Sequence, residues 1–501
     1  MSAAESTAES GGGGDDGSVG RRRKLVVLVT CCLSLFIVGL DNTILNIALP
    51  AIRSDLDASV SQLQWTIDAY TLVLAALLML AGSTADRIGR RRVFQTGLVL
   101  FAVGSLLCGL APGLEWLIVF RVVQAVGGSM LTPVAMSIVT NTFTEPRERA
   151  RAIGVWGAVV GVAMALGPIV GGALVDSAGW RSVFWINLPV ALAAIVLTAL
   201  FVPESKAPHP RRADPVSQVL VFTFLLSLTY AIIEGPEAGW SSPPIIALFT
   251  LAAGCVAGLL RWAPRRPEPL IDLRFFHSVP FAGATVIAVC AFASMSGFLF
   301  LNTLYLQDAR GFSPTEAGLH TLPMALATVV CSPISGRLLT LVGPRLPLIA
   351  AGLAMAAGAG LLVGLGEDTS TARLITAYAL FGSGFGLVNA PITNTAVSGM
   401  PRAQAGVAAA IASTSRQVGQ ALGVAVVGAT MASVLAAPGA AGLAAATHTG
   451  WWIVLGCGVA VTGLGMLTTG RWARRTAERT GAELMPAAPP AQARDTTDVR
   501  Q

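Results

Sequence analysis

Long apolar runs, repeated along nearly the whole chain, constrain its fold more than any other feature. They fall at residues 25–48, 62–81, 93–112, 114–138, 152–175, 182–202, 215–233, 244–262, 281–306, 316–341, 346–365, 373–397, 405–434 and 450–470. Each run is close to the roughly 20 residues that a helix needs to cross about 30 Å of hydrocarbon. Only 12% of the 501 residues are charged, whereas soluble domains carry about 25%. The sequence therefore predicts an all-α integral membrane protein with fourteen transmembrane helices.

Lys and Arg are distributed unevenly between the segments that join these runs. If the N-terminus is cytoplasmic, most of the 33 basic residues fall on the cytoplasmic side, and the other side holds only Arg53, Arg181, Arg310 and Arg373. Two more, Arg121 and Arg416, fall within predicted spans. Positive residues favour the cytoplasmic side, so we expect a cell-membrane protein with both termini in the cytoplasm. The net charge of +6 is then a topology signal, and we expect no nucleic-acid partner.

The first and second halves of the chain also share similar segments. The segment GSTADRIGRR (82–91) aligns without gaps on GRLLTLVGPR (336–345), and PRERA (146–150) matches PRAQA (401–405) at nearly the same offset. These matches predict two six-helix bundles, residues 24–202 and 281–471. The linker between them, 203–280, holds two extra transmembrane helices. The polar ends, 1–23 and 472–501, are expected to be disordered cytoplasmic tails.

Three charged residues lie within predicted spans of the first half: Asp41, Asp68 and Arg121. A carboxylate in a span costs free energy and rarely persists without a partner or a function. With a rise of about 1.5 Å per residue, all three fall at similar depth in the outer part of the membrane. An Arg favours the charged form of a nearby acid and burial disfavours it, so we interpret the group as a proton-coupling site. The alternative is a structural Asp41–Arg121 pair, with Asp68 facing the outside water.

Two segments have a composition that is typical of regions that change conformation. The loop at 82–92 combines small, acidic and basic residues: Gly82, Asp86, Arg87, Gly89, Arg90 and Arg91. The span at 152–175 contains Gly167, Pro168, Gly171 and Gly172, where small residues permit close helix contact and proline favours a bend. We predict that both segments act in gating. The alternatives are a topology signal for the loop and ordinary packing for the span.

Neither metal nor cofactor binding is expected. The seven Cys lie in apolar runs without metal-ligand spacing and are interpreted as packing residues. The four His pair with neither Cys nor acids at ligand spacing, and no nucleotide-binding loop of the GxxxxGK[ST] type occurs. The sequence therefore gives no support for an enzyme.

Taken together, the motifs resemble those of the major facilitator superfamily, in particular its fourteen-helix drug:proton antiporter branch. The resemblance rests on LDNTILNIALP (40–50), GSTADRIGRRR (82–92), RVVQAVGGS (121–129), ALGPIVGG (165–172), WRSVFWINLP (180–189), EGPEAGW (234–240), LYLQDARGFSPTEAGL (304–319) and TSRQVGQALG (414–423). One departure is Ala163, where the family's signature begins with Gly. The resemblance implies that Asp41 and Arg121 take part in proton coupling. It also implies that Asp86 and its basic neighbours latch the halves together on the cytoplasmic side, and that the Gly167–Gly172 bend marks export.

We therefore expect a proton-coupled exporter of amphiphilic small molecules that works by alternating access. Some members of the branch have a further acid in the tenth or a later helix, linked to dicationic substrates; none occurs here, so monovalent cationic or neutral compounds are expected. Candidate cavity residues are Asn46, Trp65, Gln124, Phe298, Asn302, Tyr305 and Asn389. The expected partners are protons, a small-molecule substrate and the lipid bilayer, with a monomer as the functional unit. The alternative is a proton-coupled symporter for a nutrient or metabolite; a receptor or scaffold leaves the buried charges unexplained.

Overall fold

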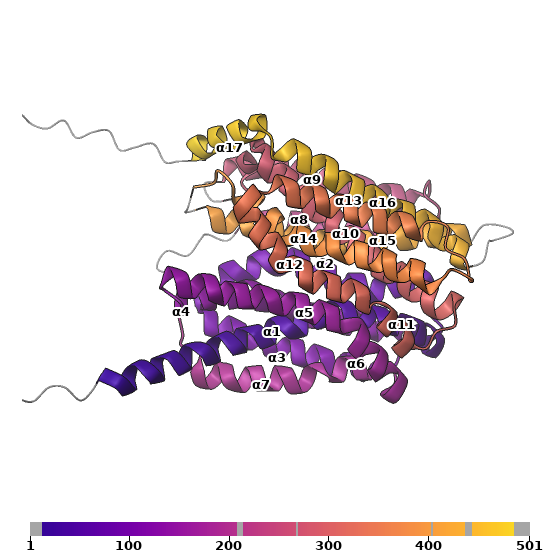
Figure 1. Ribbon diagram of the computed structural model, residues 1–501, viewed down its shortest axis with the longest axis horizontal. Helices are drawn as coiled ribbons and strands as arrows, with labels where there is room; N and C mark the ends of the chain where they lie inside the picture. Colours follow the sequence, from indigo (N-terminus) through magenta and orange to yellow (C-terminus); the bar gives the residue numbers. More distant parts are fainter. Residues whose placement is uncertain (1–12, 208–213, 267–268, 402–403, 436–442, 485–501) are drawn as a thin grey trace, which may run out of the picture.

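Long helices that run side by side make up almost all of the structure (Figure 1). The computed structural model describes residues 13–207, 214–266, 269–401, 404–435 and 443–484. Thirteen helical segments of the described chain are long and apolar enough to cross a membrane, and α5 adds the shorter apolar stretch Val162–Ala178. Counted together, they agree with the predicted all-α membrane architecture of fourteen spans.

The helices fall into two halves and a connecting segment. The first half contains α1 (Gly13–Leu56), α2 (Val60–Ile88), α3 (Arg90–Gly109), α4 (Leu114–Thr142), α5 (Pro146–Ala178), α6 (Ser182–Trp185) and α7 (Asn187–Phe201). The connecting segment contains α8 (Pro215–Ala238), α9 (Pro243–Trp262), η1 (Ala263–Arg265) and η2 (Leu273–His277). The second half contains α10 (Val279–Leu304), the π-helical turn η3 (Tyr305–Ala309), α11 (Pro314–His320), α12 (Leu322–Val342), α13 (Arg345–Leu362), α14 (Thr371–Val397), α15 (Ala405–Leu435) and α16 (Leu443–Thr468). A final helix, α17, covers Arg471–Leu484.

Local sequence signals set the ends of several helices. At the start of α2, the Gln62 amide donates to Ser59 Oγ at 3.3 Å, and the Ser59 amide donates to Gln62 Oε1 at 2.9 Å. This capping box satisfies two amides that the first turn would otherwise leave unpaired. The turn between α2 and α3 uses Gly89, whose φ of 125° is costly for residues with a side chain. Gly343, its counterpart in the duplicated loop, has a φ of 77° between α12 and α13.

Two equivalent helix pairs form the interface between the halves. Helix α2 packs against α15, and α5 packs against α12 and α11. In the sequence duplication α2 corresponds to α12, and α5 corresponds to α15. The α2–α15 and α5–α12 contacts are therefore equivalent, and α1 against α10 completes the interface.

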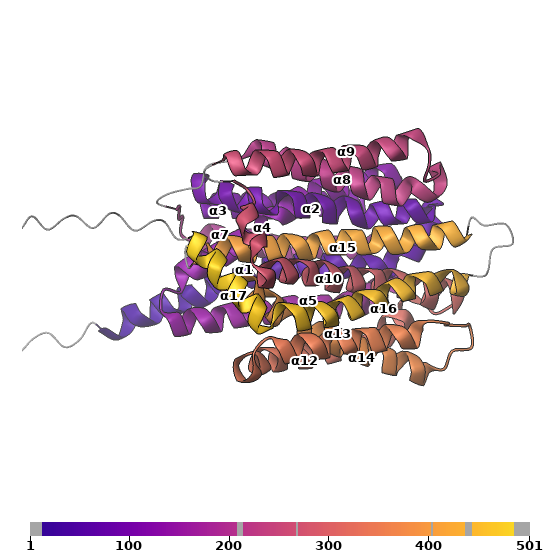
Figure 2. The ribbon, with the colours of Figure 1, turned by 90° about the horizontal axis from the view of Figure 1, so that it is seen from above.

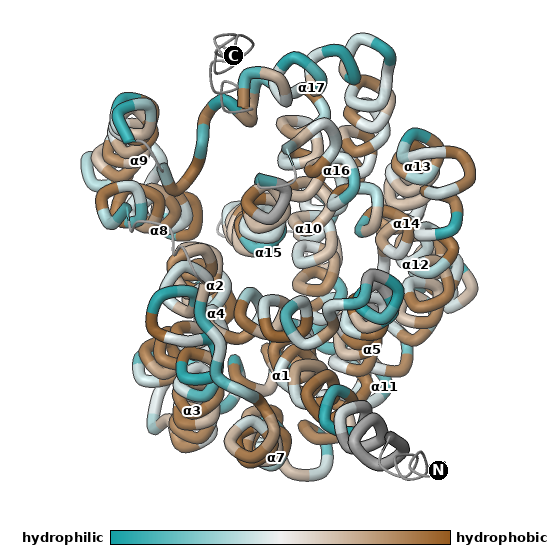
Figure 3. The backbone as a smooth tube through the Cα atoms, turned by 90° about the vertical axis from the view of Figure 1, so that its left-hand side faces the viewer, coloured by the Kyte–Doolittle hydropathy of each residue, from teal (hydrophilic) through white to brown (hydrophobic). Residues whose placement is uncertain are grey.

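The bundle has two distinct ends. The described chain begins and ends on the same side of it, on the left in Figures 1 and 2. We call this side the terminal end, and the opposite side, where residues 57–59, 310–313 and 363–370 connect helices, the distal end. Viewed along the helices, α8 and α9 form a peripheral pair beside α2 and α15 (Figure 3). Helix α8 contacts both of those helices, so the extra hairpin touches both halves.

Two helices extend into segments that we expected to be disordered. Helix α1 includes residues 13–23, and α17 includes residues 472–484; residues 1–12 and 485–501 lie outside the described chain. Figure 2 shows α17 lying across the terminal end. Small and apolar side chains at Ala473, Ala477 and Leu484 are buried, and the Val279 amide donates to Thr476 Oγ1 at 3.0 Å. This buried face, which recurs at helical spacing, explains why the segment folds against η2 and α10.

Candidate functional site

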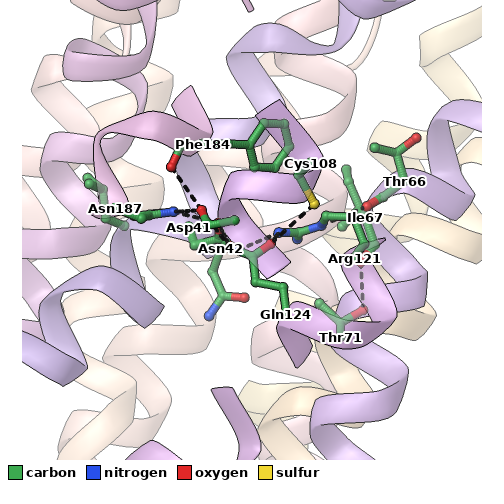
Figure 4. Close-up of polar contacts among 12 residues, drawn as sticks. Asp41, Asn42, Thr66, Ile67, Thr71, Cys108, Arg121, Gln124, Phe184 and Asn187 are labelled. Atoms are coloured by element: carbon green, nitrogen blue, oxygen red, sulfur yellow. Dashed lines mark hydrogen bonds and ion pairs between the residues drawn. The ribbon is translucent and has the colours of Figure 1, made fainter. Parts of the chain in front are cut away.

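A buried ion pair joins α1 to α4 inside the first half (Figure 4). Arg121 Nη1 lies 2.6 Å from Asp41 Oδ2, and each side chain is only 1% exposed. Arg121 Nε also donates to the Thr66 carbonyl of α2 at 3.2 Å, and its guanidinium lies 4.1 Å from the centroid of the Tyr70 ring. The charge of Arg121 is thus matched by a carboxylate, a carbonyl and an aromatic face.

Neutral polar groups complete the environment of this pair. Asp41 Oδ1 accepts from Gln124 Nε2 at 2.9 Å and from Asn187 Nδ2 at 3.2 Å. Both amides also donate to Ser105 Oγ, and Gln124 Oε1 accepts from Arg121 Nη1 at 2.7 Å. Removing one partner of such a buried pair typically costs about 3–5 kcal/mol, because the other charge is left uncompensated. The network therefore ties α1, α3, α4 and α7 together around one carboxylate.

Asp68 is in a different environment from Asp41. The Asp68 side chain, on α2, is fully buried. The alternative from the sequence, in which Asp68 faces the outside water, therefore does not hold in this conformation. Thr71 Oγ1 lies 3.3 Å from Asp68 Oδ1, while Asp68 Oδ2 has no hydrogen-bond partner. Within the described residues, no hydrogen bond or ion pair connects Asp68 to Asp41 or Arg121. The three charges that we expected to meet are thus a pair and a separate acid.

A small pocket lies between the halves, and neither Asp41 nor Asp68 is among its lining residues. Its polar walls come from Asn42, Asn46 and Thr71 of the first half and from Ser296 and Gln420 of the second. Asn42 Oδ1, Asn46 Oδ1 and Gln420 Oε1 are buried without a partner. Thr71 connects the pocket to Asp68. Along α1, the Asp41 side chain joins the buried network and the neighbouring Asn42 side chain points away from it (Figure 4).

Of the residues proposed to line a cavity, those in the first half lie in three different places. Asn46 lines the pocket. Gln124 belongs to the Asp41 network. Trp65 faces the extra hairpin, where its Nε1 donates to Glu234 Oε1 of α8 at 2.8 Å.

The candidate cavity residues of α10 and η3 pack within the second half. Phe298 stacks on Phe381 with ring centroids 4.5 Å apart, and Asn302 accepts a hydrogen bond from the Tyr378 hydroxyl. The Tyr305 hydroxyl donates to the Gly366 carbonyl at 2.7 Å. These side chains stabilise the second half from inside. Asn389 is partly buried on α14, and its Nδ2 lies 3.4 Å from the Phe385 carbonyl of the same helix.

The glycines of α5 allow two close helix contacts. A methyl group at Gly171 would lie 2.6 Å from the Ile47 side chain of α1, and one at Gly167 would overlap Thr43. On the other side of α5, a methyl group at Gly172 would overlap the Pro314 carbonyl of α11. The reciprocal contact places Gly318 of α11 against the Pro168 carbonyl. Pro168 and Gly172 are therefore packed backbone to backbone against α11 of the second half, while Gly167 and Gly171 pack against α1.

Polar contacts join the halves at the distal end. Arg53 Nη1 lies 3.2 Å from Asp308 Oδ2, and Gln307 Nε2 donates to the Ile47 carbonyl at 2.9 Å. The Thr315 amide donates to Asp176 Oδ2 at 2.9 Å. These bonds cross from α1 to η3 and from α5 to α11 and hold the distal end closed.

The loop at 82–92 makes its described contacts within the first half and the connecting segment. Arg90 Nη2 lies 2.8 Å from Asp86 Oδ1, and Arg91 Nη2 donates to the Ala199 carbonyl at 2.6 Å. A side chain at Gly89 would lie 2.6 Å from Glu204 Oε1, which accepts from the Arg91 amide. Gly82 lies against Pro133, and Arg87 also has an interaction partner. In this conformation the loop is tied to the chain that follows α7.

Sequence reasoning missed Asn187, Ser105 and Tyr70 as members of the buried network. Asn187 could have been predicted, because it is a polar residue in the WRSVFWINLP stretch that carries the family resemblance. Ser105 and Tyr70 gave no such signal, since a lone hydroxyl in an apolar run is common. Among the described residues, no group of three His, Cys, Asp or Glu could hold a metal ion.

Comparisons with known proteins match most of the chain. The Major Facilitator Superfamily family description matches residues 31–424. The chain is 38% identical over 407 residues to the multidrug resistance protein Stp of Mycobacterium tuberculosis, covering 81% of this chain and 75% of that one. It is 37% identical over 402 residues to the tetracenomycin C resistance and export protein of Streptomyces glaucescens, covering 80% and 74%.

A third relative and a solved structure agree with these matches. The multidrug efflux pump LfrA of Mycolicibacterium smegmatis is 34% identical over 398 residues, covering 79% of this chain and 78% of that one. The fold resembles the crystal structure of a bacterial homolog of the human lysosomal transporter Spinster, in an inward-facing and unoccupied conformation. That similarity has a TM-score of 0.62 at 19% identity and covers 91% of this chain and 98% of the other.

Proposed function

The chain belongs to the Major Facilitator Superfamily, and we propose that it exports amphiphilic small molecules across the cell membrane in exchange for protons. The relatives named above are described as multidrug resistance, export and efflux proteins. Their shared activity supports the same direction of transport here. Substrate and proton would use one site between the halves, exposed to each side of the membrane in turn.

The single observation that carries the proposal is the position of Asp68. This carboxyl is fully buried, has one oxygen without a partner, and is connected through Thr71 to the pocket between the halves. A buried carboxylate without a counter-charge is costly, so the neutral, protonated form fits this site. Opening the pocket to water would make release of the proton less costly. We therefore assign proton exchange to Asp68 and a supporting role in coupling to the separate Asp41–Arg121 pair.

The contacts between the halves support an alternating-access cycle. Arg53–Asp308 and Asp176–Thr315 join the halves at the distal end. With both termini in the cytoplasm, as the distribution of Lys and Arg favours, the distal end faces outside and this conformation is closed to the outside. Opening that end requires breaking these bonds and separating α5 from α11. The loop at 82–92 would then contact the second half at the terminal end, which is the latch that the resemblance implies.

The substrate is expected to be a monovalent or neutral amphiphile. The second half has acids only at or near the distal end, among them Asp308, Glu316, Glu367 and Asp368, so a second positive charge would have no counter-charge deep in that half. We propose that the protein works as a monomer, without nucleic-acid or cofactor partners. Dicationic compounds are therefore expected to be poor substrates.

Proton release from inverted membrane vesicles tests the proposal. Vesicles are loaded with acid, a transported dye is added outside, and proton efflux is followed with a pH-sensitive fluorophore. Asp68→Asn should abolish dye-driven proton efflux because the group that exchanges the proton is lost. Asp41→Asn should abolish it as well, because Arg121 is left without its carboxylate. Glu115→Gln, at an exposed acid in the first turn of α4, is the matched control and should behave as wild type.

Two outcomes would count against the proposal. Normal dye-driven proton efflux with Asp68→Asn would remove Asp68 from the coupling step. Dye and protons moving in the same direction in the wild-type protein would favour the symporter alternative instead.

A further inference from the structure

A second arginine, Arg416, lies in α15 of the second half. Its Nη1 donates to Ser413 Oγ at 3.4 Å, and its Nη2 donates to Thr393 Oγ1 of α14. Its Nε is buried without a partner. The guanidinium lies 5.9 Å from the centroid of the Phe292 ring. No ion pair of Arg416 occurs within the described parts of the chain.

Arg416 has fewer partners than Arg121 and, among the described residues, no carboxylate. Arg121 has a carboxylate at 2.6 Å, a carbonyl at 3.2 Å and an aromatic face at 4.1 Å. Arg416 has two hydroxyl groups and a more distant ring. A guanidinium carries five N–H donors and stays charged in proteins. Hydroxyl groups accept hydrogen bonds but do not neutralise that charge, so Arg416 is an uncompensated cation inside a membrane-spanning helix.

Such a charge is expensive and usually marks a substrate or ion pathway. Packing gives no reason for it here, because the one polar bond from Arg416 to α14 among the described residues goes to the Thr393 hydroxyl, a bond that a neutral side chain also makes. The proton exchange proposed above uses Asp68, Asp41 and Arg121 of the first half and does not involve Arg416. The position therefore needs an anionic partner that the described chain does not supply.

Arg416 lies within reach of the pocket between the halves. Gln420, which lines that pocket, is one turn further along the same face of α15. Phe292 is likewise one turn before the pocket residue Ser296 on α10, and Ser296 Oγ donates to the Gln420 carbonyl at 2.7 Å. Both helices run from the terminal to the distal end, so Arg416 lies on the terminal side of the pocket. The distal end is closed, so a ligand that enters from the terminal side meets Arg416 before Gln420.

We propose that Arg416 binds a carboxylate of the transported molecule, and that the apolar body of that molecule lies against Phe292 and the apolar pocket residues Met295 and Val424 once the halves separate around it. The planar guanidinium fork matches a carboxylate in two parallel hydrogen bonds, and the free Nε supplies one of them. This inference rests on the proposed function and refines it. It moves the expected substrates away from simple cations, which Arg416 would repel, and toward amphiphiles with an acidic group, whether zwitterionic or anionic.

A matched pair of fluorescent probes tests the inference on the full-length protein. Dansyl-leucine carries a carboxylate, and its methyl ester has the same apolar body without the charge. Binding of each is measured by dansyl fluorescence with purified protein in lipid nanodiscs, with empty nanodiscs subtracted. The wild-type protein should bind the acid at least about tenfold more tightly than the ester, as expected for a hydrogen-bonded charge pair. Arg416→Gln should remove that preference by weakening acid binding, and Arg416→Lys should retain part of it.

Two controls separate recognition from structural support. Arg261→Gln removes an exposed arginine at the end of α9 and should leave the preference unchanged. Arg416→Gln should not lower the melting temperature, because it removes an uncompensated charge. Equal weakening of both probes together with a lower melting temperature would mean that Arg416 is structural, and would overturn the inference.

If Arg416→Gln fails to fold, the wild-type measurement still tests whether the protein prefers the acid to the ester. Equal affinity of the wild-type protein for acid and ester would overturn the inference on its own. Failure of the proposed function would look different, because dye-driven proton efflux from wild-type vesicles would then be absent while the acid preference in nanodiscs persists.

Discussion

Replacing Gly172 with Ala should shift the protein toward the conformation that is open at the distal end. Gly172 of α5 faces the backbone of α11, where an added methyl group would overlap the Pro314 carbonyl oxygen and lie 2.8 Å from its carbon and 2.9 Å from Thr315 Cα. All three atoms belong to the backbone, so no side-chain rotation relieves the overlap. The helices themselves must separate.

The size of the effect follows from the cost of inserting one methyl group into a closed contact. Overpacking of this kind costs typically about 1–3 kcal/mol. The strain exists only while α5 and α11 are in contact, so the full cost falls on the state with a closed distal end. The ratio of distal-open to distal-closed molecules should therefore rise by roughly 5- to 150-fold.

Distances between spin labels measure that ratio. In a variant without the seven native cysteines, one pair of labels is placed at the exposed residues Glu115 and Glu367, on opposite halves of the distal end. A second pair at Thr144 and Leu341, also exposed, reports on the terminal end. Gly172→Ala should lengthen the distal distances and shorten the terminal ones.

Gly154 provides the matched control on the same helix. A methyl group there would meet no atom within 4 Å, so Gly154→Ala should leave both distance distributions unchanged. Identical distributions for Gly172→Ala and Gly154→Ala would refute the role of the α5–α11 contact in distal closure. A change at both ends in the same direction would point to general loosening of the bundle and would refute it as well.

Two smaller effects follow from contacts near the helix ends. Burial raises the pKa of the Asp214 carboxyl, but hydrogen bonds from Ser217 and Trp262 outweigh burial, so this pKa lies below its usual range. The stability that Asp214 provides is therefore complete above about pH 4 and is lost as the pH falls through the depressed value. Asp214→Asn should lower the melting temperature at pH 7 and reduce its further fall between pH 5 and pH 3; parallel curves for both proteins would contradict this. The partly exposed Arg53–Asp308 pair should contribute only about 0.2–1 kcal/mol to distal closure. A double-mutant cycle of Arg53→Gln and Asp308→Asn, read out with the distal spin labels, measures this contribution. Strictly additive effects of the two substitutions would show that the pair has no interaction energy.

The sequence was sufficient for the fold because membrane architecture depends on the length and order of apolar runs. The internal duplication added the correspondence between α2 and α12 and between α5 and α15, and the observed helix contacts follow that correspondence. The polar average composition of the segment at 472–484 predicts a disordered tail. The spacing of Ala473, Ala477 and Leu484 contains the helical signal that an average conceals.

The site was predictable in part, and the rest depended on helix rotation. Asp41 and Arg121 lie at similar depth on helices that turn them toward each other. The sequence places Asp68 at the same depth, but the rise per residue gives height and not azimuth, and among the described residues Asp68 bonds to Thr71 of its own helix and to neither Asp41 nor Arg121. The same limit explains why Phe298 and Asn302, chosen for their chemistry, lie inside the second half. Chemical type does not tell which face of a helix a residue occupies.

The contact between α5 and α11 has a consequence for how this protein can change over time. Gly172 faces the Pro314 carbonyl and Gly318 faces the Pro168 carbonyl, so backbone atoms form much of this joint. Most of the residues that line the pocket, such as Asn46 and Gln420, belong to other helices, and the one on α5, Met164, lies about two turns before Gly172. Substitutions that alter which molecules fit the pocket therefore leave this joint unchanged. Selection can diversify the cargo without having to rebuild the mechanism that moves it.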